Sequence, residues 1–379
     1  MNKKIMIIAG EASGDLHGAA LIDELLKIDP QLEISGIGGD KMIKSGLKKI
    51  YHISEMSFLG FVEVIKHLPF IKKVKANLIN HVQIEGIKTV VLIDYPGFNL
   101  SIAKSFYKLG VKNIYYISPQ IWAWGKGRIK KIKNIINRMI VFFPFEKELY
   151  SSNNVHSDFV GHPLVNKIET YDFLSKKELV EKYNLDEEKD ILVLLPGSRK
   201  QEISEIFKDV IDGAEKIADE FDLQIVIAGA DNIEEEYIRS FSNSINYKII
   251  KGDTYSLLKN AKFAIVKSGT STLETAIIGT PFLVVYKTSF LTYLIGKSLI
   301  KIKNIALANI VAEKTIVKEL IQNEVTANNI YKEAKNILGD QKKTEKLKND
   351  LSEIKRKLKT EGNPNKKAAE IIYAELNAI

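Results

Sequence analysis

Residues 189–221 read KDILVLLPGSRKQEISEIFKDVIDGAEKIADEF, and their pattern decides the fold class. The five apolar residues Ile191–Leu195 are typical of a strand that is buried on both faces. A Pro-Gly turn follows, and the residues from there to Phe221 carry apolar side chains at helical spacing. A strand, a glycine turn and a helix in this order are the repeating unit of a parallel sheet that is covered by helices.

The same alternation recurs along most of the chain. Further strands are predicted at Ile5–Ala9, Ile34–Gly36, Val90–Ile93, Asn113–Ile117, Met139–Phe143, Gln224–Ala228, Tyr247–Ile250, Phe263–Val266 and Phe282–Val285. Helices are predicted at Leu16–Leu26, Ser101–Leu109, Arg128–Ile136 and from Gly269 to Ile278. The rhythm breaks between Gly161 and Leu185. We therefore predict two doubly wound, Rossmann-like α/β domains, 1–165 and 166–341, followed by a helical tail at 342–379.

Composition limits the class of protein. A chain of 379 residues favours two domains, and 45% hydrophobic with 27% charged residues is typical of a globular protein. The net charge of +8 favours anionic partners, with solvated lysine-rich faces as the alternative. The absence of cysteine excludes disulfides and thiol catalysis and is compatible with a cytoplasmic location. The run Ile5–Ala9 is too short for a signal peptide, and no apolar stretch is long enough to span a bilayer.

Polar loops follow the predicted strands of the first domain, where an α/β sheet binds its ligands. Residues 10–15 read GEASGD, and the two glycines let backbone N–H groups approach an anion or a sugar. The alternative is a tight turn with Asp15 as a helix cap. Asp94 directly follows an apolar strand, where a carboxylate is costly unless it is paired or functional. General-base catalysis needs such a carboxylate, and a turn aspartate is the alternative.

Aromatic and basic residues gather in two further segments. Both tryptophans, Trp122 and Trp124, lie in the loop SPQIWAW, where indoles suit sugar stacking, a membrane interface or core packing. Residues 126–138 then carry six basic and no acidic side chains, as in a phosphate-facing, membrane-facing or merely solvated helix. Residues 58–73 suit an interfacial segment, an acyl-chain groove or an ordinary buried helix. Their candidate contact residues are Phe58, Phe61, Val62, Ile65, Leu68 and Phe70.

Two loops of the second domain predict a diphosphate site. Residues 195–199 (LPGSR) and 268–274 (SGTSTLE) each place a glycine turn between a strand and a helix. The start of a helix offers free N–H groups and the positive end of the helix dipole, and Arg199 adds a bidentate cation. Glu274 lies one turn into its helix, where a carboxylate could accept hydrogen bonds from two ribose hydroxyls.

Ten blocks in order resemble the lipid-A-disaccharide synthase family of inverting glycosyltransferases. The blocks are AGEASGD (9–15), GIGGDKM (36–42), FLGFVEV (58–64), IDYPGFN (93–99), SPQIWAW (118–124), FPFEKELY (143–150), VGHPL (160–164), LPGSRKQEI (195–203), SGTSTLE (268–274) and NIVAEKTIVKELIQ (309–322). The resemblance implies the GT-B architecture, in which two Rossmann-like domains face a central cleft. It also implies transfer of a sugar from UDP-2,3-diacylglucosamine to 2,3-diacylglucosamine 1-phosphate (lipid X), as in Gram-negative lipid A biosynthesis.

The resemblance also implies roles for residues. Asp94 would deprotonate the acceptor hydroxyl. The donor UDP site would comprise Gly197, Ser198, Arg199, Ser268, Gly269, Thr270, Glu274, Asn309 and a helix with Glu319 and Gln322. The acceptor side would comprise Glu11, Ser13, Gly14, Asp15, Asn99 and Trp122. No cofactor or metal is expected, because the chain has no D-x-D pair and its six histidines lack ligand spacing. The expected location is the cytoplasmic face of the inner membrane, with no nucleic acid partner and with a homodimer left open.

This chain departs from the usual pattern of the family at two places, and other functions are also compatible with parts of the sequence. Family members usually carry Asp where this chain has Gly97. They usually carry Gly-Arg and then Pro in the 309–322 block, where this chain has Glu313-Lys314 and Val317-Lys318. Lys314 keeps the charge but loses the guanidinium fork. Rival enzymes are a UDP-GlcNAc 2-epimerase and the peptidoglycan-type UDP-GlcNAc transferase. An epimerase needs no acyl groove. A basic lipid-binding protein without enzymatic activity is the third alternative, and it leaves the two glycine loops unexplained.

Overall fold

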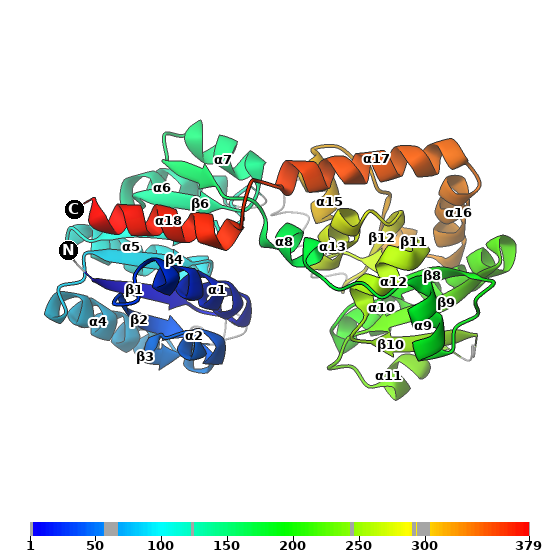
Figure 1. Cartoon of the computed structure of the whole chain (residues 1–379), viewed down its shortest axis with the longest axis horizontal. Coiled ribbons are helices and arrows are strands. Elements are labelled where there is room, and N and C mark those ends of the chain that lie inside the picture. Colours follow the sequence, from blue (N-terminus) through cyan, green and yellow to red (C-terminus); the bar gives the residue numbers. More distant parts are fainter. Residues whose placement is uncertain are drawn as a thin grey trace. The chain divides into compact units, whose positions relative to one another are not determined.

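The computed structural model describes residues 3–56, 67–122, 125–242, 246–289, 293 and 304–378. Its contacts divide the chain into two compact units (Figure 1). The first comprises Met1–Pro163 and Leu358–Ile379, and the second comprises Leu164–Lys357. The segment predicted as a separate tail is instead shared. Helix α17 (Gln341–Leu358) packs almost wholly in the second unit, whereas α18 (Pro364–Asn377) returns to the first.

The first unit is built on a parallel sheet of seven strands in the order β3-β2-β1-β4-β5-β6-β7. The strands are β1 (Lys4–Ala9), β2 (Glu33–Gly38), β3 (Lys48–His52), β4 (Thr89–Ile93), β5 (Lys112–Tyr116), β6 (Arg138–Val141) and β7 (Ser157–Phe159). The helices are α1 (Ala12–Ile28), α2 (Asp40–Lys44), η1 (Ile53–Glu55), α4 (Leu68–Ile84), α5 (Pro96–Lys108), η2 (Lys126–Arg128), α6 (Ile129–Ile135) and α7 (Pro144–Ser151), together with α18. Parallel pairing brings the carboxyl ends of the strands to one edge.

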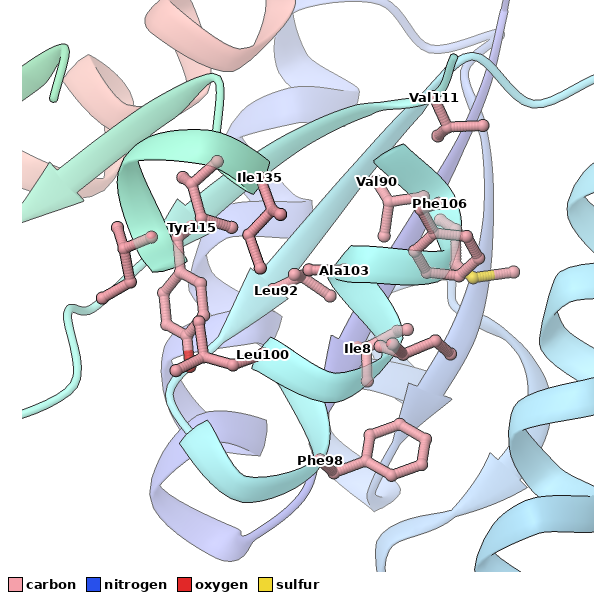
Figure 2. Packing of buried hydrophobic residues seen from close by; sticks show 14 of the residues in the cluster. Ile8, Val90, Leu92, Phe98, Leu100, Ala103, Phe106, Val111, Tyr115 and Ile135 are labelled. Carbon is pink, nitrogen blue, oxygen red and sulfur yellow. The ribbon is translucent and has the colours of Figure 1, made fainter. Parts of the chain in front are cut away.

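Alternation along the strands builds a core on each face of this sheet. On β1, Met6 and Ile8 pack with α4, α5 and α6, whereas Ile5 and Ile7 pack with α1 and α18. Figure 2 shows the first of these cores, where side chains of α5 such as Ala103 meet strand residues such as Ile8 and Leu92. Both faces are therefore covered, which explains why these strands read as continuous apolar runs.

The second unit repeats the plan with a parallel sheet of six strands in the order β10-β9-β8-β11-β12-β13. The strands are β8 (Asp190–Leu195), β9 (Leu223–Gly229), β10 (Tyr247–Lys251), β11 (Ala261–Lys267), β12 (Phe282–Tyr286) and β13 (Glu319–Ile321). The helices are α8 (Pro163–Glu169), α9 (Lys176–Tyr183), α10 (Lys200–Phe221), α11 (Glu235–Arg239), α12 (Thr254–Asn260), α13 (Thr270–Ile278), α15 (Leu307–Ala312), η3 (Gln322–Glu324) and α16 (Ala327–Leu338), together with α17. Each unit has its own core, and the α/β fold class is confirmed.

One predicted helix is wrong. The residues from Glu319 to Gln322 do not form a helix, because Glu319–Ile321 form the edge strand β13, which pairs in parallel with β12. Only the 3-10 turn η3 follows. The backbone hydrogen bonds of this segment go to the sheet, and a short segment with tertiary partners need not follow its helical spacing.

The segment predicted to contact membrane or acyl chains is only partly described. Phe58, Phe61, Val62 and Ile65 lie outside the described residues. Leu68 opens α4 and is 43% exposed, whereas Phe70 packs against the core and meets the ring of Tyr51 edge to face at 6.2 Å. Within the described ranges, no helix combines the length and the apolar character needed to cross a membrane.

The last helix holds the first unit together. Glu375 in α18 binds Lys112 of β5 at 2.9 Å and Arg138 of β6 at 2.9 Å, and Arg138 also binds Asp158 of β7. Beneath these ion pairs, Ile372 is fully buried in the core that α1 and α18 share. Helix α18 therefore covers part of one face of a sheet that the N-terminal part of the chain forms.

We expect Ile372→Ala to destabilise the first unit by about 2–5 kcal/mol, because it leaves a cavity under α18. The exposed neighbour Glu370 is the matched control, and Glu370→Ala should change stability by no more than about 0.5 kcal/mol. Both tryptophans belong to this unit, so urea unfolding followed by tryptophan fluorescence reports on it selectively. Equal midpoints for the two variants would contradict the packing role of α18.

Candidate functional site

A cavity of about 600 Å³ lies in the second unit, at the carboxyl ends of β8, β9, β10 and β11. Seven of the predicted donor-site residues line it: Gly197, Ser198, Arg199, Ser268, Gly269, Thr270 and Glu274. Helices α10 and α13 begin at the two glycine loops, so the positive ends of two helix dipoles lie at this wall. The arrangement suits an anionic ligand.

Backbone geometry explains the glycine of the first loop. Gly197 has φ of +113°, a conformation that residues with a side chain rarely adopt. A Cβ atom there would also lie 2.7 Å from the Glu202 carboxylate. The Glu202 carboxylate in turn accepts a hydrogen bond from the backbone N–H of Ser198 at 3.3 Å, which ties the loop to α10. The loop is thus shaped by its sequence before any ligand binds.

Lys267 supplies a cation that the sequence reasoning missed. It ends β11, lines the cavity and is 15% exposed, and its Nζ donates to Glu202 at 2.7 Å. Burial alone would raise the pKa of Glu202, but the hydrogen bond and the charge of Lys267 hold this pKa below its usual value. The lysine directly precedes the SGTSTLE block, so a polar residue at a strand end was the available signal. By contrast, Arg199 is 81% exposed and only loosely paired with Glu202 at 3.7 Å.

Three predicted donor-site residues lie outside this cavity lining. Asn309 is fully buried and accepts hydrogen bonds from the backbone N–H groups of Ile316 and Val317. Glu319 accepts from the N–H groups of Ile305 and Ala306, and Gln322 exchanges two hydrogen bonds with the backbone of Thr288. Their polar atoms bind the chain itself, so the structure gives them a role in holding loops.

In the first unit, Asp94 lies at the end of β4 in a strained backbone. Asp94 and Tyr95 both have left-handed conformations, with φ of +44° and +45°. Such conformations cost free energy and persist only where neighbours impose them. The Asn99 side chain donates to the carbonyl groups of Ile93 and Asp94, and the Tyr115 hydroxyl donates to the Asp94 carbonyl at 2.5 Å. Asn99, predicted on the acceptor side, therefore fixes the backbone that carries Asp94.

Burial and a neighbouring negative charge determine the electrostatic surroundings of Asp94. Burial, and then the negative charge of Glu11, raise the pKa of Asp94 to about 6. Near neutral pH the group is mostly ionised yet close to its proton-binding range, which suits a general base. Glu11 is the exposed cap residue of α1, and it lies close enough to Asp94 for its negative charge to raise the pKa of Asp94.

The glycine loop after β1 packs against the residues on either side of Asp94. A Cβ atom on Gly10 would lie 2.2 Å from the ring of Tyr95, so only glycine leaves room for that ring. Gly14 packs close to Ala9 and Ile93, and Ser13 is exposed. Another acceptor-side candidate, Asp15, has a structural role. The Asp15 carboxylate is 5% exposed and accepts from the backbone N–H groups of Gly39, Lys41 and Met42, which anchors the start of α2.

A buried carboxyl group holds the tryptophan loop. Glu146, at the start of α7, is 2% exposed and accepts hydrogen bonds from Ser118 Oγ at 2.5 Å and from Trp122 Nε1 at 3.2 Å. Burial raises the pKa of Glu146 to about 7 in spite of these hydrogen bonds. The half-buried Trp122 ring also meets Phe145 edge to face at 5.4 Å. Glu146 lies in the block 143–150 but was not predicted as a site residue, because nothing in the sequence shows that it is buried.

No group of three or more histidine, aspartate and glutamate side chains suited to a metal ion is found in the part of the chain that the structure describes. The two parallel α/β units with their glycine loops define the fold class of GT-B glycosyltransferases and their relatives. The match to the UDP-bound MnaA structure of S. aureus spans 99% of this chain and 97% of that one, with a TM-score of 0.64 and 15% sequence identity. The match to the calicheamicin glycosyltransferase CalG4 spans 99% of this chain and 98% of that one, with a TM-score of 0.64 and 12% sequence identity.

Comparison of sequences narrows the class to a family. The family model described as lipid-A-disaccharide synthetase matches residues 5–373. The lipid-A-disaccharide synthase of Geobacter metallireducens is 38% identical over 95% of this chain and 94% of its own, and that of Coxiella burnetii is 36% identical over 98% of both. The chain belongs to the lipid-A-disaccharide synthase family and is a hexosyltransferase. Family membership favours this interpretation over the epimerase, although UDP-GlcNAc 2-epimerases are among the structural neighbours.

We expect Gly10→Ala to lower the turnover rate about 10²-fold, because the new methyl group displaces the Tyr95 ring and with it Asp94. Gly97 is the matched control. It lies in the same region, a methyl group added there would meet no atom within 4 Å, and Gly97→Ala should keep the rate within about twofold. The measurement is UDP release under saturating substrates, with circular dichroism to verify folding. A folded Gly10→Ala protein with unchanged turnover would contradict the role assigned to this close contact.

Proposed function

We propose that the protein transfers 2,3-diacylglucosamine from its UDP derivative to the 6-hydroxyl of 2,3-diacylglucosamine 1-phosphate. The acceptor oxygen forms a bond to the anomeric carbon of the donor while the bond from that carbon to UDP breaks, so the configuration inverts. The products are a β(1→6)-linked disaccharide 1-phosphate and UDP. Besides family membership, the tuned carboxylate of Asp94 at the strand end carries this proposal.

In this proposal Asp94 takes the proton of the acceptor hydroxyl. Its ionised form is needed, and the constrained backbone at 94–95 keeps the carboxylate in one place. A positioned general base contributes about 10²–10⁴-fold in rate. Trp122, held by Glu146, would present its indole face to a sugar ring on the acceptor side.

The cavity of the second unit would hold the UDP part of the donor. The two glycine loops and the cations Arg199 and Lys267 would bind the diphosphate, and Glu274 would accept hydrogen bonds from the ribose. Negative charge develops on the diphosphate as the sugar leaves. Preorganised N–H groups and cations at that position therefore stabilise the transition state more than the ground state.

The rate of transfer should rise with pH and level off above about 6, because the ionised form of Asp94 is the active one and burial raises its pKa to about 6. Asp94→Asn should lower the rate about 10²–10⁴-fold.

Glu11→Gln should move the rising limb of the pH–rate profile to lower pH, because it removes a negative charge that raises the pKa of Asp94. The measurement is acceptor-dependent UDP release in detergent micelles. If the rising limb of the pH–rate profile stays at the same pH in the Glu11→Gln variant, Asp94 is not the group whose ionisation produces it.

We also propose that the protein binds the anionic inner leaflet through the face formed by α4, α5 and α6. Residues 67–84, 96–109 and 125–137 contain no aspartate or glutamate. The exposed lysines on these helices are Lys72, Lys73, Lys104, Lys108, Lys130, Lys131 and Lys133. Burial, together with the positive charges of Lys131 and Lys104, lowers the pKa of Lys75, which indicates that lysines from all three helices lie close together.

The same face exposes apolar side chains among its lysines. Leu68 on α4 and Tyr107 on α5 are 43% and 53% exposed, and Leu109 follows α5 at 40% exposed. A surface with lysines around exposed aromatic and aliphatic groups is typical of proteins that lie in the headgroup region of a membrane. Both proposed substrates carry acyl chains, so contact with the membrane would bring the enzyme to them.

The triple variant Lys72→Gln, Lys104→Gln, Lys131→Gln removes one charge from each helix of this face. At roughly 1 kcal/mol per lysine near an anionic surface, binding to phosphatidylglycerol vesicles should fall about 10²-fold. The control replaces Lys342, Lys346 and Lys348 by glutamine, which removes the same charge from the exposed side of α17. Co-sedimentation with anionic and neutral vesicles gives the readout. Equal losses for both variants would show that net charge, and not this face, determines binding.

A further inference from the structure

The carboxylate of Glu274, on the wall of the cavity in the second unit, is held by a phenol that the proposed function has not used. The hydroxyl of Tyr255 donates to Glu274 Oε1 at 2.6 Å, and both residues line the cavity. No other hydrogen bond or ion pair to Glu274 is found in the described part of the chain. One carboxylate oxygen is thus engaged, and the other has no protein partner there.

Tyr255 is itself fixed. It is 7% exposed and lies on the short helix α12, which follows the glycine turn after β10. Its ring meets that of Tyr171 edge to face at 5.1 Å, and Lys167 Nζ lies 5.1 Å from the ring centre. Burial and the charge of Glu274 raise the pKa of the Tyr255 hydroxyl, so it stays protonated and donates its hydrogen to the carboxylate.

This geometry has a chemical consequence. An ionised carboxylate only accepts hydrogen bonds, so its ligand must bring hydroxyl or N–H donors. A carboxylate held in one rotamer has its free lone pairs in place before the ligand arrives, and the ordering cost at binding is smaller. A pair of neighbouring hydroxyls, as on a ribose, fits such an acceptor, whereas a ring that lacks one hydroxyl leaves part of the carboxylate unpaired in a desolvated site.

We propose that Tyr255 is a positioning residue that sets Glu274 for ribose and so makes this cavity select ribonucleoside over 2′-deoxyribonucleoside diphosphates. The proposal rests on the proposed binding of UDP in this cavity. It adds that the selection comes from the Tyr255–Glu274 pair and not from the diphosphate contacts, which both ligands share.

The test compares dissociation constants of UDP and 2′-deoxy-UDP, measured by titration calorimetry on the full chain. A hydrogen bond to a charged group predicts that the unaltered protein binds UDP about 10–100 times more tightly than 2′-deoxy-UDP. Tyr255→Phe keeps the ring and its packing but removes the donor. It should weaken UDP binding about tenfold and change 2′-deoxy-UDP binding by no more than about twofold, so that the selectivity shrinks.

Two controls separate positioning from structural damage. Tyr331 also donates its hydroxyl to a glutamate, Glu220, but this pair joins α16 to α10 away from the cavity lining. Tyr331→Phe should leave both dissociation constants unchanged. In a Glu274→Gln background, Tyr255→Phe should have almost no further effect on UDP binding, because the two residues act as one unit.

Some outcomes would overturn the proposal. Equal weakening of UDP and 2′-deoxy-UDP by Tyr255→Phe would show that the phenol only supports the wall of the cavity. A full additional loss in the Glu274→Gln background would show that Tyr255 acts without Glu274. If the unaltered protein bound neither nucleotide, both this proposal and the assignment of the cavity to UDP would fail, whereas tight but unselective binding would overturn the Tyr255 proposal alone.

Discussion

The parallel pairing of strands is the constraint on which the sites of this protein depend. Because β1 and β4 run in parallel, the loop with Gly10 and the loop with Asp94 leave the sheet at the same edge and touch. The same pairing of β8 with β11 brings the 197–199 loop and the 267–270 loop to one cavity wall. Neither site needs residues that are close in sequence, because the sheet gathers them.

Both units also contain buried or partly buried carboxylates, and these carboxylates differ in their hydrogen-bond and charge partners. Asp94 has only limited compensation, so burial raises its pKa into the range of a general base. Glu202 has Lys267 beside it and keeps a lowered pKa. The Asp15 carboxylate accepts hydrogen bonds from three backbone N–H groups, which fix the start of α2. The three carboxylates thus differ in how far hydrogen bonds and opposite charges offset the cost of their burial.

The sequence predicted the long strands and the glycine loops, because continuous apolar runs such as Ile191–Leu195 are buried on both faces and allow few alternatives. It did not predict edge strands such as β7 and β13, which have three residues each and owe their form to a neighbour. For the candidate site, Asp94 and Arg199 were predicted from their positions in loops that follow strands, and their proposed roles stay predictions. Lys267, Glu146 and Tyr255 were missed, because their importance lies in partners that are distant in sequence. The sequence also does not show that the amide of Asn309, predicted in the donor site, binds the backbone.

We propose that a sugar passes from UDP to a lipid hydroxyl with inversion. The most direct measurement incubates the protein in mixed micelles with UDP-2,3-diacylglucosamine and 2,3-diacylglucosamine 1-phosphate, quantifies UDP, and identifies the product by mass spectrometry and by NMR of the new anomeric proton. We expect one UDP for each disaccharide formed, no UDP release without the lipid acceptor, and a β-configured 1→6 linkage. UDP release that does not depend on the acceptor, or a donor changed at its C2 centre without disaccharide, would contradict it.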